Sequence, residues 1–138
     1  MGFRSFLHRI TAPKLSKSVE NHPLKLVLVI NHSLGMKKGK IAAQVGHASV
    51  QTLLSAGSVI PHIVDAWLAQ GQKKVCVKAV DEQQMNELST KAKQANLHIS
   101  KTIDAGHTQI PKGSYTVLAI GPGYEAEVDE ITGHLSLL

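Results

Sequence analysis

The sequence has little cysteine and no long apolar run, and each absence excludes a class of protein. Cys76 is the single cysteine among 138 residues, which excludes an internal disulfide framework and a zinc site built from CxxC pairs. No apolar run approaches the roughly 18 residues that a membrane-spanning helix needs. The eight histidines form neither HExxH nor HxH, so we expect no metal and no metal-dependent chemistry.

A phosphate-binding loop of the Walker A type is also missing. Such a loop has four residues between its glycines and a Ser or Thr after its Lys. Here three residues separate Gly35 from Gly39, and Ile41 follows Lys40. Nucleotide hydrolysis by that route is therefore excluded.

The net charge of +5 is distributed unevenly along the chain. Residues 1–24 contain four bases and one acid, whereas the other 114 residues carry a net charge of only +2. The length corresponds to one domain, which buries roughly two-thirds of its unfolded surface and needs no disulfide. Because the folded part is only mildly basic, affinity for nucleic acid must come from local patches.

The first 23 residues differ in composition from the rest and are expected to precede a domain at residues 24–138. They are rich in Arg, Lys, Ser and Thr, and Met1–Ile10 can form a short amphipathic helix with Phe3, Phe6, Leu7 and Ile10 on one side. This composition is typical of a mitochondrial presequence. A disordered basic tail explains it nearly as well, so the expected location is mitochondrial or cytoplasmic rather than secreted.

Hydrophobic periodicity predicts strands and helices in the order β-α-α-β-α-β-β-α. The predicted strands cover 24–31, 73–80, 98–103 and 115–120. Helices are predicted from Gly39 to Ala56, from Pro61 to Gln70, between Asp81 and Asn96, and over 125–132. Gly57 should end the first helix, and Gly121-Pro-Gly should break the last strand. Helices between most strands favour a mixed sheet covered by helices, with the last two strands antiparallel.

Polar residues gather where the first strand gives way to the first helix. Lys40, Gln44 and His47 are spaced to share one helix face, opposite an apolar stripe of Ile41, Val45, Ala48 and Thr52. Ligands of open α/β sheets bind at this edge, and helix N-termini attract anions. Lys37 and Lys38 add charge, so a phosphate-bearing ligand is predicted. Surface lysines, a solvated glutamine and a half-buried histidine would account for the same residues without a ligand.

A second polar stretch, from Asp104 to Ser114, follows the third predicted strand. The Asp104 carboxylate leaves a buried strand directly into Ala-Gly, and Thr108, Gln109, Ser114 and Thr116 offer hydroxyls and an amide. Asp, Gly, Thr and Ser are also ordinary turn residues, and this stretch alone favours a plain hairpin loop. An Asp–His–Ser triad through His107 is not supported by the spacing.

Five segments occur in order, with compatible gaps, between residues 24 and 138. They are Lys38-Gly-Lys-Ile-Ala-Ala-Gln-Val-Gly-His-Ala, Lys74–Val80 followed by Asp81-Glu82, Asp104-Ala-Gly-His-Thr-Gln-Ile, Thr116-Val-Leu-Ala-Ile-Gly-Pro-Gly, and Asp129-Glu-Ile-Thr-Gly-His-Leu-Ser-Leu. Together they resemble the archaeal and eukaryotic type of peptidyl-tRNA hydrolase. The resemblance implies a single three-layer α/β/α domain with a four-stranded mixed sheet, often dimeric, so a homodimer is an expectation. It also implies a hydrolase without cofactor or metal that cleaves the ester between a peptide and the tRNA 3′ ribose.

The family's functional residues fall on Lys40, Asp104, Thr108 and Thr116. By this resemblance Lys40 would hold a tRNA phosphate or stabilise the oxyanion, and Asp104 would orient Lys40 or act as the base. Thr108 would position the water and Thr116 the ester or ribose. Contacts to the peptidyl-tRNA substrate are expected from Lys38, Gln44, His47, His107, Gln109 and Ser114.

The chain departs from the family pattern at two places that concern the site. His107 stands where the family usually has Arg, and the first strand ends in Asn31-His32-Ser33 instead of a basic residue and an acid. These departures keep a second hypothesis open, a non-catalytic adaptor that binds tRNA or a protein. The enzyme is preferred because all four polar positions are present.

Overall fold

The computed structural model describes residues 21–106 and 110–138, and all but the last three residues of the N-terminal extension lie outside this part. The four strands are β1 (Leu24–Asn31), β2 (Lys74–Ala79), β3 (Ile99–Ile103) and β4 (Tyr115–Tyr124). A short 3-10 helix, η1 (His32–Leu34), follows β1, and the α-helices are α3 (Lys38–Val59), α4 (Pro61–Ala69), α5 (Glu82–Gln94) and α6 (Glu125–Thr132). The predicted order of elements is confirmed.

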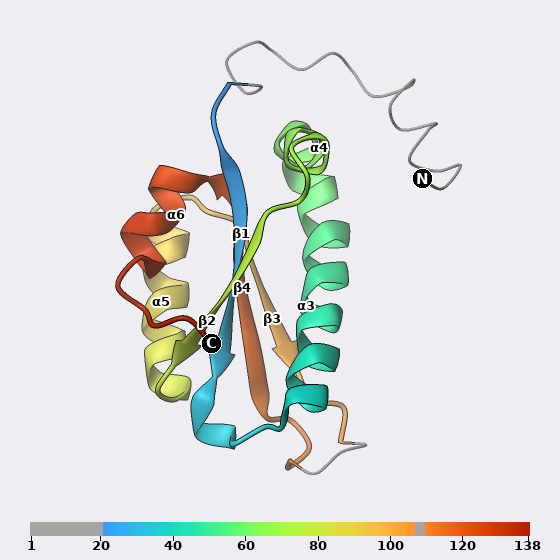
Figure 1. The fold of residues 1–138 in the computed structure, drawn as a ribbon, viewed down its shortest axis with the longest axis vertical. Coiled ribbons are helices and arrows are strands. Elements are labelled where there is room, and N and C mark those ends of the chain that lie inside the picture. Colours follow the sequence, from blue (N-terminus) through green and yellow to red (C-terminus); the bar gives the residue numbers. More distant parts are fainter. Residues whose placement is uncertain (1–20, 107–109) are drawn as a thin grey trace, which may run out of the picture.

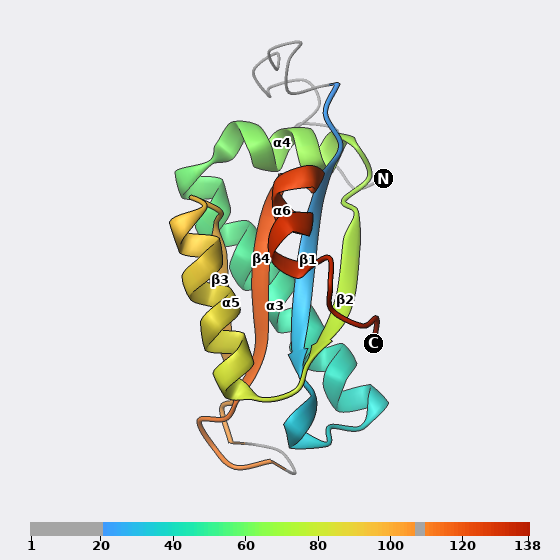
Figure 2. The same ribbon diagram turned by 90° about the vertical axis from the view of Figure 1, so that its left-hand side faces the viewer.

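The strands form one mixed sheet in the order β2-β1-β4-β3. β1 is parallel to β2, and β4 is antiparallel to β1 and β3. Helices α3 and α4 cover one face and α5 and α6 the other, so the domain has three layers (Figures 1 and 2). The mixed α/β/α architecture expected from the sequence is confirmed.

Strand alternation divides the core into two clusters, one on each face. On β1, Leu24, Leu26, Leu28 and Ile30 pack beneath α3 and α4, together with Ala48 and Trp67. Val27 and Val29 point the other way, against Met85 and Leu88 of α5 and Val128 of α6. Because both faces are covered, β1 is buried along its whole length, as its continuous apolar sequence predicts.

Two predicted element ends are wrong. Helix α3 does not end at Gly57 but continues to Val59, and the Ile60 N–H still donates to the Ala56 carbonyl, 2.7 Å away. The helix ends because Pro61 disfavours the helical conformation at the preceding residue, and Ile60 has φ −130° and ψ 55°. Strand β4 likewise continues past Gly121-Pro-Gly to Tyr124. A Cβ atom on Gly121, at φ +108°, would lie 2.7 Å from the Lys25 carbonyl oxygen, so glycine permits the close pairing with β1.

An irregularity in the pairing of β3 with β4 determines where Thr116 points. Thr102 pairs with Val117 and Ile103 pairs with Tyr115, which leaves Thr116 as an extra residue, a β-bulge. Strict alternation would put Thr116 on the same face as Leu118, under α5. The bulge instead turns its side chain toward α3, where it contacts Gln44.

The two edges of the sheet are protected differently. The chain from Ser136 to Leu138 runs along the outer edge of β2: the Lys78 N–H donates to the Ser136 carbonyl and the Leu138 N–H to the Cys76 carbonyl. The other edge strand, β3, is short and carries the exposed Lys101, both of which discourage pairing with another sheet. Among the described residues, no helix has the length and apolar content required to cross a lipid bilayer.

Candidate functional site

Two charged side chains from distant parts of the chain meet at the carboxyl end of β1. The Lys40 ammonium, in the first turn of α3, forms an ion pair with Oδ1 of Asp104, which follows β3. Only 12% of the Lys40 side chain and 3% of the Asp104 side chain are exposed. Both segments lie at the lower end of Figure 1. The geometry brings together the two residues that the sequence analysis treated as the central pair.

Backbone hydrogen bonds hold Asp104 in place. Its N–H donates to the Ser114 carbonyl at 2.9 Å, and its own carbonyl accepts from the Gly113 N–H at 3.0 Å. The second carboxylate oxygen, Oδ2, accepts from the Gly106 N–H at 3.0 Å. Both oxygens therefore have protein donors, which compensates for the burial of the charge.

One turn further along α3, a buried amide meets the bulge in β4. The Thr116 hydroxyl lies 2.5 Å from Oε1 of Gln44 and 3.1 Å from the Thr102 carbonyl oxygen, so its proton has two acceptors. Thr116 is fully buried and Gln44 is 4% exposed. The Thr116 hydroxyl therefore joins the bulge in β4 to both β3 and α3.

The position of Gln44 differs from the sequence prediction. We expected it opposite the apolar stripe of α3, but it lies in one buried row with Ala48, Thr52 and Ala56. The residues of this row follow one another at intervals of four, and Lys40 precedes Gln44 by the same interval. The row begins with Lys40 and Gln44, which meet Asp104 and Thr116, and continues with the small side chains of Ala48, Thr52 and Ala56.

Sequence reasoning missed three residues that support this arrangement. Thr102 donates through its hydroxyl to Oε1 of Gln51 on α3, 3.0 Å away. Asn31, at the end of β1, donates from Nδ2 to the Tyr115 carbonyl at 2.9 Å, next to the bulge. The seven-residue interval between Gln44 and Gln51 was a usable signal, because it puts both amides on one side of a helix.

Asn31 also explains one departure of this chain from the family pattern. Its Oδ1 accepts from the Ser33 N–H at 3.2 Å and from the Ser33 hydroxyl at 2.6 Å, which caps η1. The residues Asn31-His32-Ser33 therefore build a capped turn between β1 and α3. Nδ2 of the same Asn31 side chain ties this turn to β4 through the Tyr115 carbonyl.

The remaining predicted residues lie around the ion pair or outside the described part. Lys38 and His47 are exposed on α3, and half-buried Ser114 donates its hydroxyl to the Pro111 carbonyl at 2.6 Å. His107, Thr108 and Gln109 fall outside the described residues. In the part that is described, no group of three His, Cys, Asp or Glu side chains could hold a metal ion.

Tyr115, next to Thr116, faces the opposite side of the sheet. It is 4% exposed, and its hydroxyl has no hydrogen-bond partner among the described residues. Burial, and then the negative charge of Glu82, raise the pKa of this phenol above its ordinary value. Tyr115 therefore stays neutral at physiological pH and belongs to the core beneath α5.

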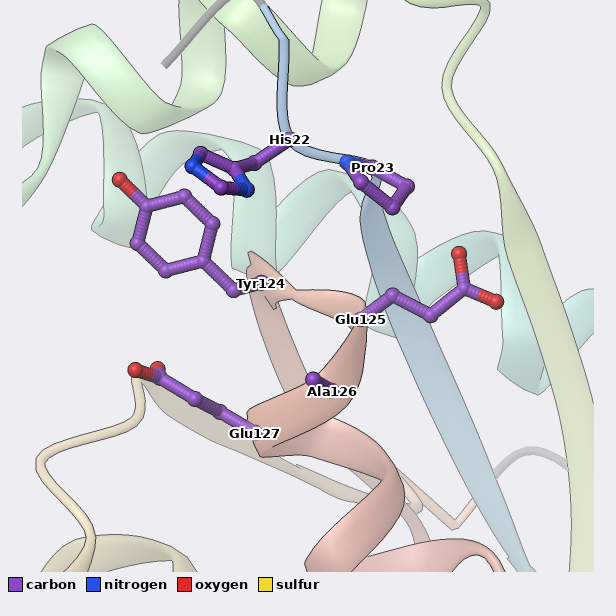
Figure 3. Close-up of a pocket in the computed structure, with 6 residues that line it drawn as sticks. All are labelled: His22, Pro23, Tyr124, Glu125, Ala126 and Glu127. Atoms are coloured by element: carbon purple, nitrogen blue, oxygen red, sulfur yellow. The ribbon is translucent and has the colours of Figure 1, made fainter. Parts of the chain in front are cut away.

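A shallow hollow lies at the other end of the sheet. It has a volume of about 350 Å³ and is lined by His22, Pro23, Tyr124, Glu125, Ala126 and Glu127 (Figure 3). The His22 and Tyr124 rings meet edge to face, with centroids 5.7 Å apart. These residues come from the start of β1 and the start of α6, whereas Lys40 and Asp104 follow the opposite ends of β1 and β3.

Known proteins match this sequence over nearly the whole described chain. The sequence model of the family described as "Peptidyl-tRNA hydrolase PTH2" matches residues 24–138. The peptidyl-tRNA hydrolase of Methanocaldococcus jannaschii is 47% identical over 115 residues, which are 83% of this chain and 100% of that relative. The Bos taurus protein named peptidyl-tRNA hydrolase 2, mitochondrial, is 46% identical over 118 residues, 86% of this chain and 66% of the relative. The Homo sapiens protein of the same name is 42% identical over 130 residues, which are 94% of this chain and 73% of that relative. The chain therefore belongs to the PTH2 family of peptidyl-tRNA hydrolases.

Proposed function

We propose that the protein hydrolyses the ester between a peptide and the 3′ ribose of tRNA, and that the Lys40–Asp104 pair is the reacting centre. The family match supports the type of reaction. The single observation that supports this position of the active site is the Lys40–Asp104 ion pair at the carboxyl end of β1. Such an activity releases tRNA from peptidyl-tRNA so that the tRNA can be charged again. No comparison favours the alternative of a non-catalytic adaptor.

In this proposal Lys40 stabilises the negative charge that develops on the ester carbonyl oxygen when water attacks. A cation fixed in a water-poor site does this well, because it needs no reorientation during the reaction. Asp104 orients the ammonium, since one carboxylate oxygen contacts Lys40 and the other is fixed by the Gly106 N–H. The same carboxylate is also a candidate for accepting a proton from the water.

Gln44 and Thr116 act in this proposal by positioning. The buried Thr116 hydroxyl and the Gln44 amide bind each other, and Gln44 lies one turn from Lys40 on α3. Their bond fixes the height of α3 above β4, and with it the position of the Lys40 ammonium. The role of the Thr116 hydroxyl is therefore to hold the site in place.

The substrate contacts expected from the family resemblance remain part of the proposal. Lys38 and His47 are exposed on the same helix as Lys40, and Ser114 belongs to the turn that fixes Asp104. Thr108 is proposed to position the water, and His107 and Gln109 to contact the RNA; all three lie outside the described residues. Phosphate contacts of this kind place the substrate without reading its sequence.

The direct test uses N-acetylated aminoacyl-tRNA and its unblocked counterpart as substrates. We expect release of tRNA from the acetylated form alone. Lys40→Ala and Asp104→Asn should each lower kcat by at least about 100-fold, the loss typical of removing one stabiliser of an oxyanion. The control is Lys91→Ala, which removes an exposed lysine of α5.

Two outcomes would contradict the proposal. Wild-type protein that binds tRNA but turns over neither substrate would support the adaptor instead. Near-normal kcat in both Lys40→Ala and Asp104→Asn, with melting temperatures showing that the variants are folded, would remove the assignment of the site.

We also propose that the protein forms a homodimer through the exposed face of α3. From Ile41 to Val59 this helix contains no Lys, Arg, Asp or Glu. Its outer face has small exposed residues in the first half (Ala42, Ala43, Gly46) and large ones in the second (Val50, Leu53, Leu54). In a two-fold, antiparallel pair the large half of each helix meets the small half of the other.

Light scattering after gel filtration tests the dimer. Leu54 is 69% exposed, so Leu54→Lys should leave the fold intact and convert the dimer to a monomer. Val80→Lys is the matched control, because Val80 is equally exposed but lies beyond β2. A wild-type monomer at micromolar concentration would contradict this part of the proposal.

The proposed compartment is the mitochondrion. Support comes from the basic composition of residues 1–20 and from the names of the bovine and human relatives, both called mitochondrial. Fractionation of cells that make the protein, with sequencing of its mature N-terminus, is the test. Recovery in the cytosolic fraction with an intact Met1 would contradict it.

A further inference from the structure

A tight turn next to the site carries a lysine that the family resemblance does not assign. Pro111, Lys112, Gly113 and Ser114 form this turn, in which the Ser114 N–H donates to the Pro111 carbonyl at 3.2 Å. Gly113 has φ +84°, the positive value that the third position of a type II turn requires. Lys112 therefore occupies the corner of the turn, and it is exposed.

The turn has a fixed position relative to Asp104. The two residues that follow Lys112 make the connection, because the Ser114 carbonyl accepts from the Asp104 N–H and the Gly113 N–H donates to the Asp104 carbonyl. These two bonds tie the backbone of Asp104 to the turn. Lys112 is thus attached to the same backbone frame as the reacting pair.

The stem of Lys112 packs on a glycine that itself binds Asp104. A Cβ atom added to Gly106 would lie only 2.8 Å from Cβ and 2.9 Å from Cγ of Lys112, so the lysine stem occupies that space. The N–H of the same Gly106 donates to Oδ2 of Asp104. Packing of the apolar stem leaves the ammonium at the surface, the usual arrangement for a lysine on a packed segment.

Among the described residues, no carboxylate forms an ion pair with Lys112. In the described chain there are three ion pairs, Lys25–Asp129, Lys40–Asp104 and Lys73–Glu125, and none includes Lys112. The Asp104 charge is already matched by Lys40. An exposed positive charge is therefore carried by the turn that is bonded to the Asp104 backbone.

We propose that Lys112 binds the phosphate next to the 3′-terminal ribose of the tRNA while the ester lies at Lys40. This rests on the proposed function, since it requires the ester to be at the Lys40–Asp104 pair. The substrate is an ester on the last ribose of a strand whose next charged group is a phosphate. The Lys112 ammonium lies on the turn that is bonded to Asp104, so it is suited to bind this phosphate. Phosphate contacts of this kind fix the position of a nucleic acid on a protein.

The experiment measures kcat and KM of Lys112→Ala on N-acetyl-aminoacyl-tRNA at several salt concentrations. We expect KM to rise about three- to tenfold with kcat nearly unchanged. The slope of log(kcat/KM) against log[salt] should become shallower by about 0.7, the value for one phosphate contact on a single strand. Lys112→Arg should keep the wild-type slope, and Lys91→Ala serves as the exposed-lysine control.

The outcomes separate this inference from the proposed function. If wild-type protein does not hydrolyse the substrate, the proposed function fails. If wild-type protein is active and Lys112→Ala has an unchanged salt slope, the inference alone is overturned. A fall in kcat with unchanged KM also overturns it, because that pattern would mean that Lys112 only supports the geometry of Asp104.

Discussion

The two faces of the sheet use buried polar groups in different ways. Beneath α5 and α6 the core consists mainly of apolar side chains, and a buried hydroxyl such as that of Thr132 bonds within its own helix, to the Val128 carbonyl. Beneath α3, three polar side chains of the helix bond across the interface: Lys40 donates to Asp104, and Gln44 and Gln51 accept from the Thr116 and Thr102 hydroxyls. Both faces thus supply apolar burial, and the α3 face adds directional contacts between helix and sheet.

This difference shows how the site can be held accurately in a domain of ordinary size. Apolar packing contributes most of the stability but tolerates exchanges of similar volume. Hydrogen bonds contribute less net free energy, yet they require particular partners at particular distances. Substitutions on the two faces should therefore separate stability from activity.

The largest expected effect is the loss of stability from Met85→Ala. Met85 is fully buried beneath the sheet, and such a truncation costs about 2–5 kcal/mol in free energy of unfolding. Urea denaturation measures this loss, and kcat per folded molecule should stay within about twofold of wild type. Met85→Leu conserves volume and should cost less than about 1.5 kcal/mol. A large fall in kcat for folded Met85→Ala would contradict the view that the α5 face contributes to stability rather than to activity.

The next effect is the loss of activity from Thr116→Val. This change keeps the shape of the side chain but removes the hydroxyl that binds Gln44, so the amide is left buried without that partner. Steady-state kinetics should show kcat reduced about 10- to 100-fold, which is about 1.4–2.7 kcal/mol.

The matched control for Thr116→Val is Thr132→Val on the other face. Thr132 is also buried, and its hydroxyl bonds only to its own helix among the described residues, so the change should lower stability slightly and leave kcat unchanged. Equal losses of kcat in the two variants would mean that the α3 face has no special role in positioning.

The smallest effect concerns pH and His98, whose Nε2 lies 2.8 Å from the Ser55 hydroxyl of α3. Burial lowers the pKa of His98 below its ordinary 6.5, so the unfolded chain takes up this proton first as the pH falls. The free energy of unfolding therefore decreases as the pH drops through about 6.5 toward the folded pKa. His98→Gln removes this titrating group. Between pH 7.5 and 5.5 the free energy of unfolding, measured by denaturation, should therefore decrease less for the variant than for wild type. An equal decrease would contradict the assignment.

Most of the fold could be predicted because its signals are local. The apolar run of β1, the Asp81 cap and the positive φ of 57° at Asn96 all act within a few residues. The Asp81 carboxylate accepts from the Gln84 N–H, and the Gln84 side-chain oxygen accepts in turn from the Val80 N–H. Gly57 and Gly121 were misread because the surrounding helix and sheet override a single glycine.

The site could be predicted only in part, because its precise arrangement depends on non-local pairing. The edge of the sheet pointed to Lys40, whereas Asp104 was assigned through the family resemblance, because its own stretch favoured a plain hairpin loop. No local pattern, however, reveals the bulge that turns Thr116 to the α3 face, since alternation with Leu118 predicts the opposite. The same holds for Thr102 and Asn31, whose partners lie 51 and 84 residues away in sequence.

The strand-like contact of residues 136–138 with β2 has a consequence for how the molecule behaves in concentrated solution. An open edge of a parallel strand is a template on which other molecules can add strands. Here the chain covers that template itself through the Ser136 carbonyl and the Leu138 N–H. Trimming the last three residues should therefore promote fibrous association well before it affects the reaction, and turbidity over time would reveal it.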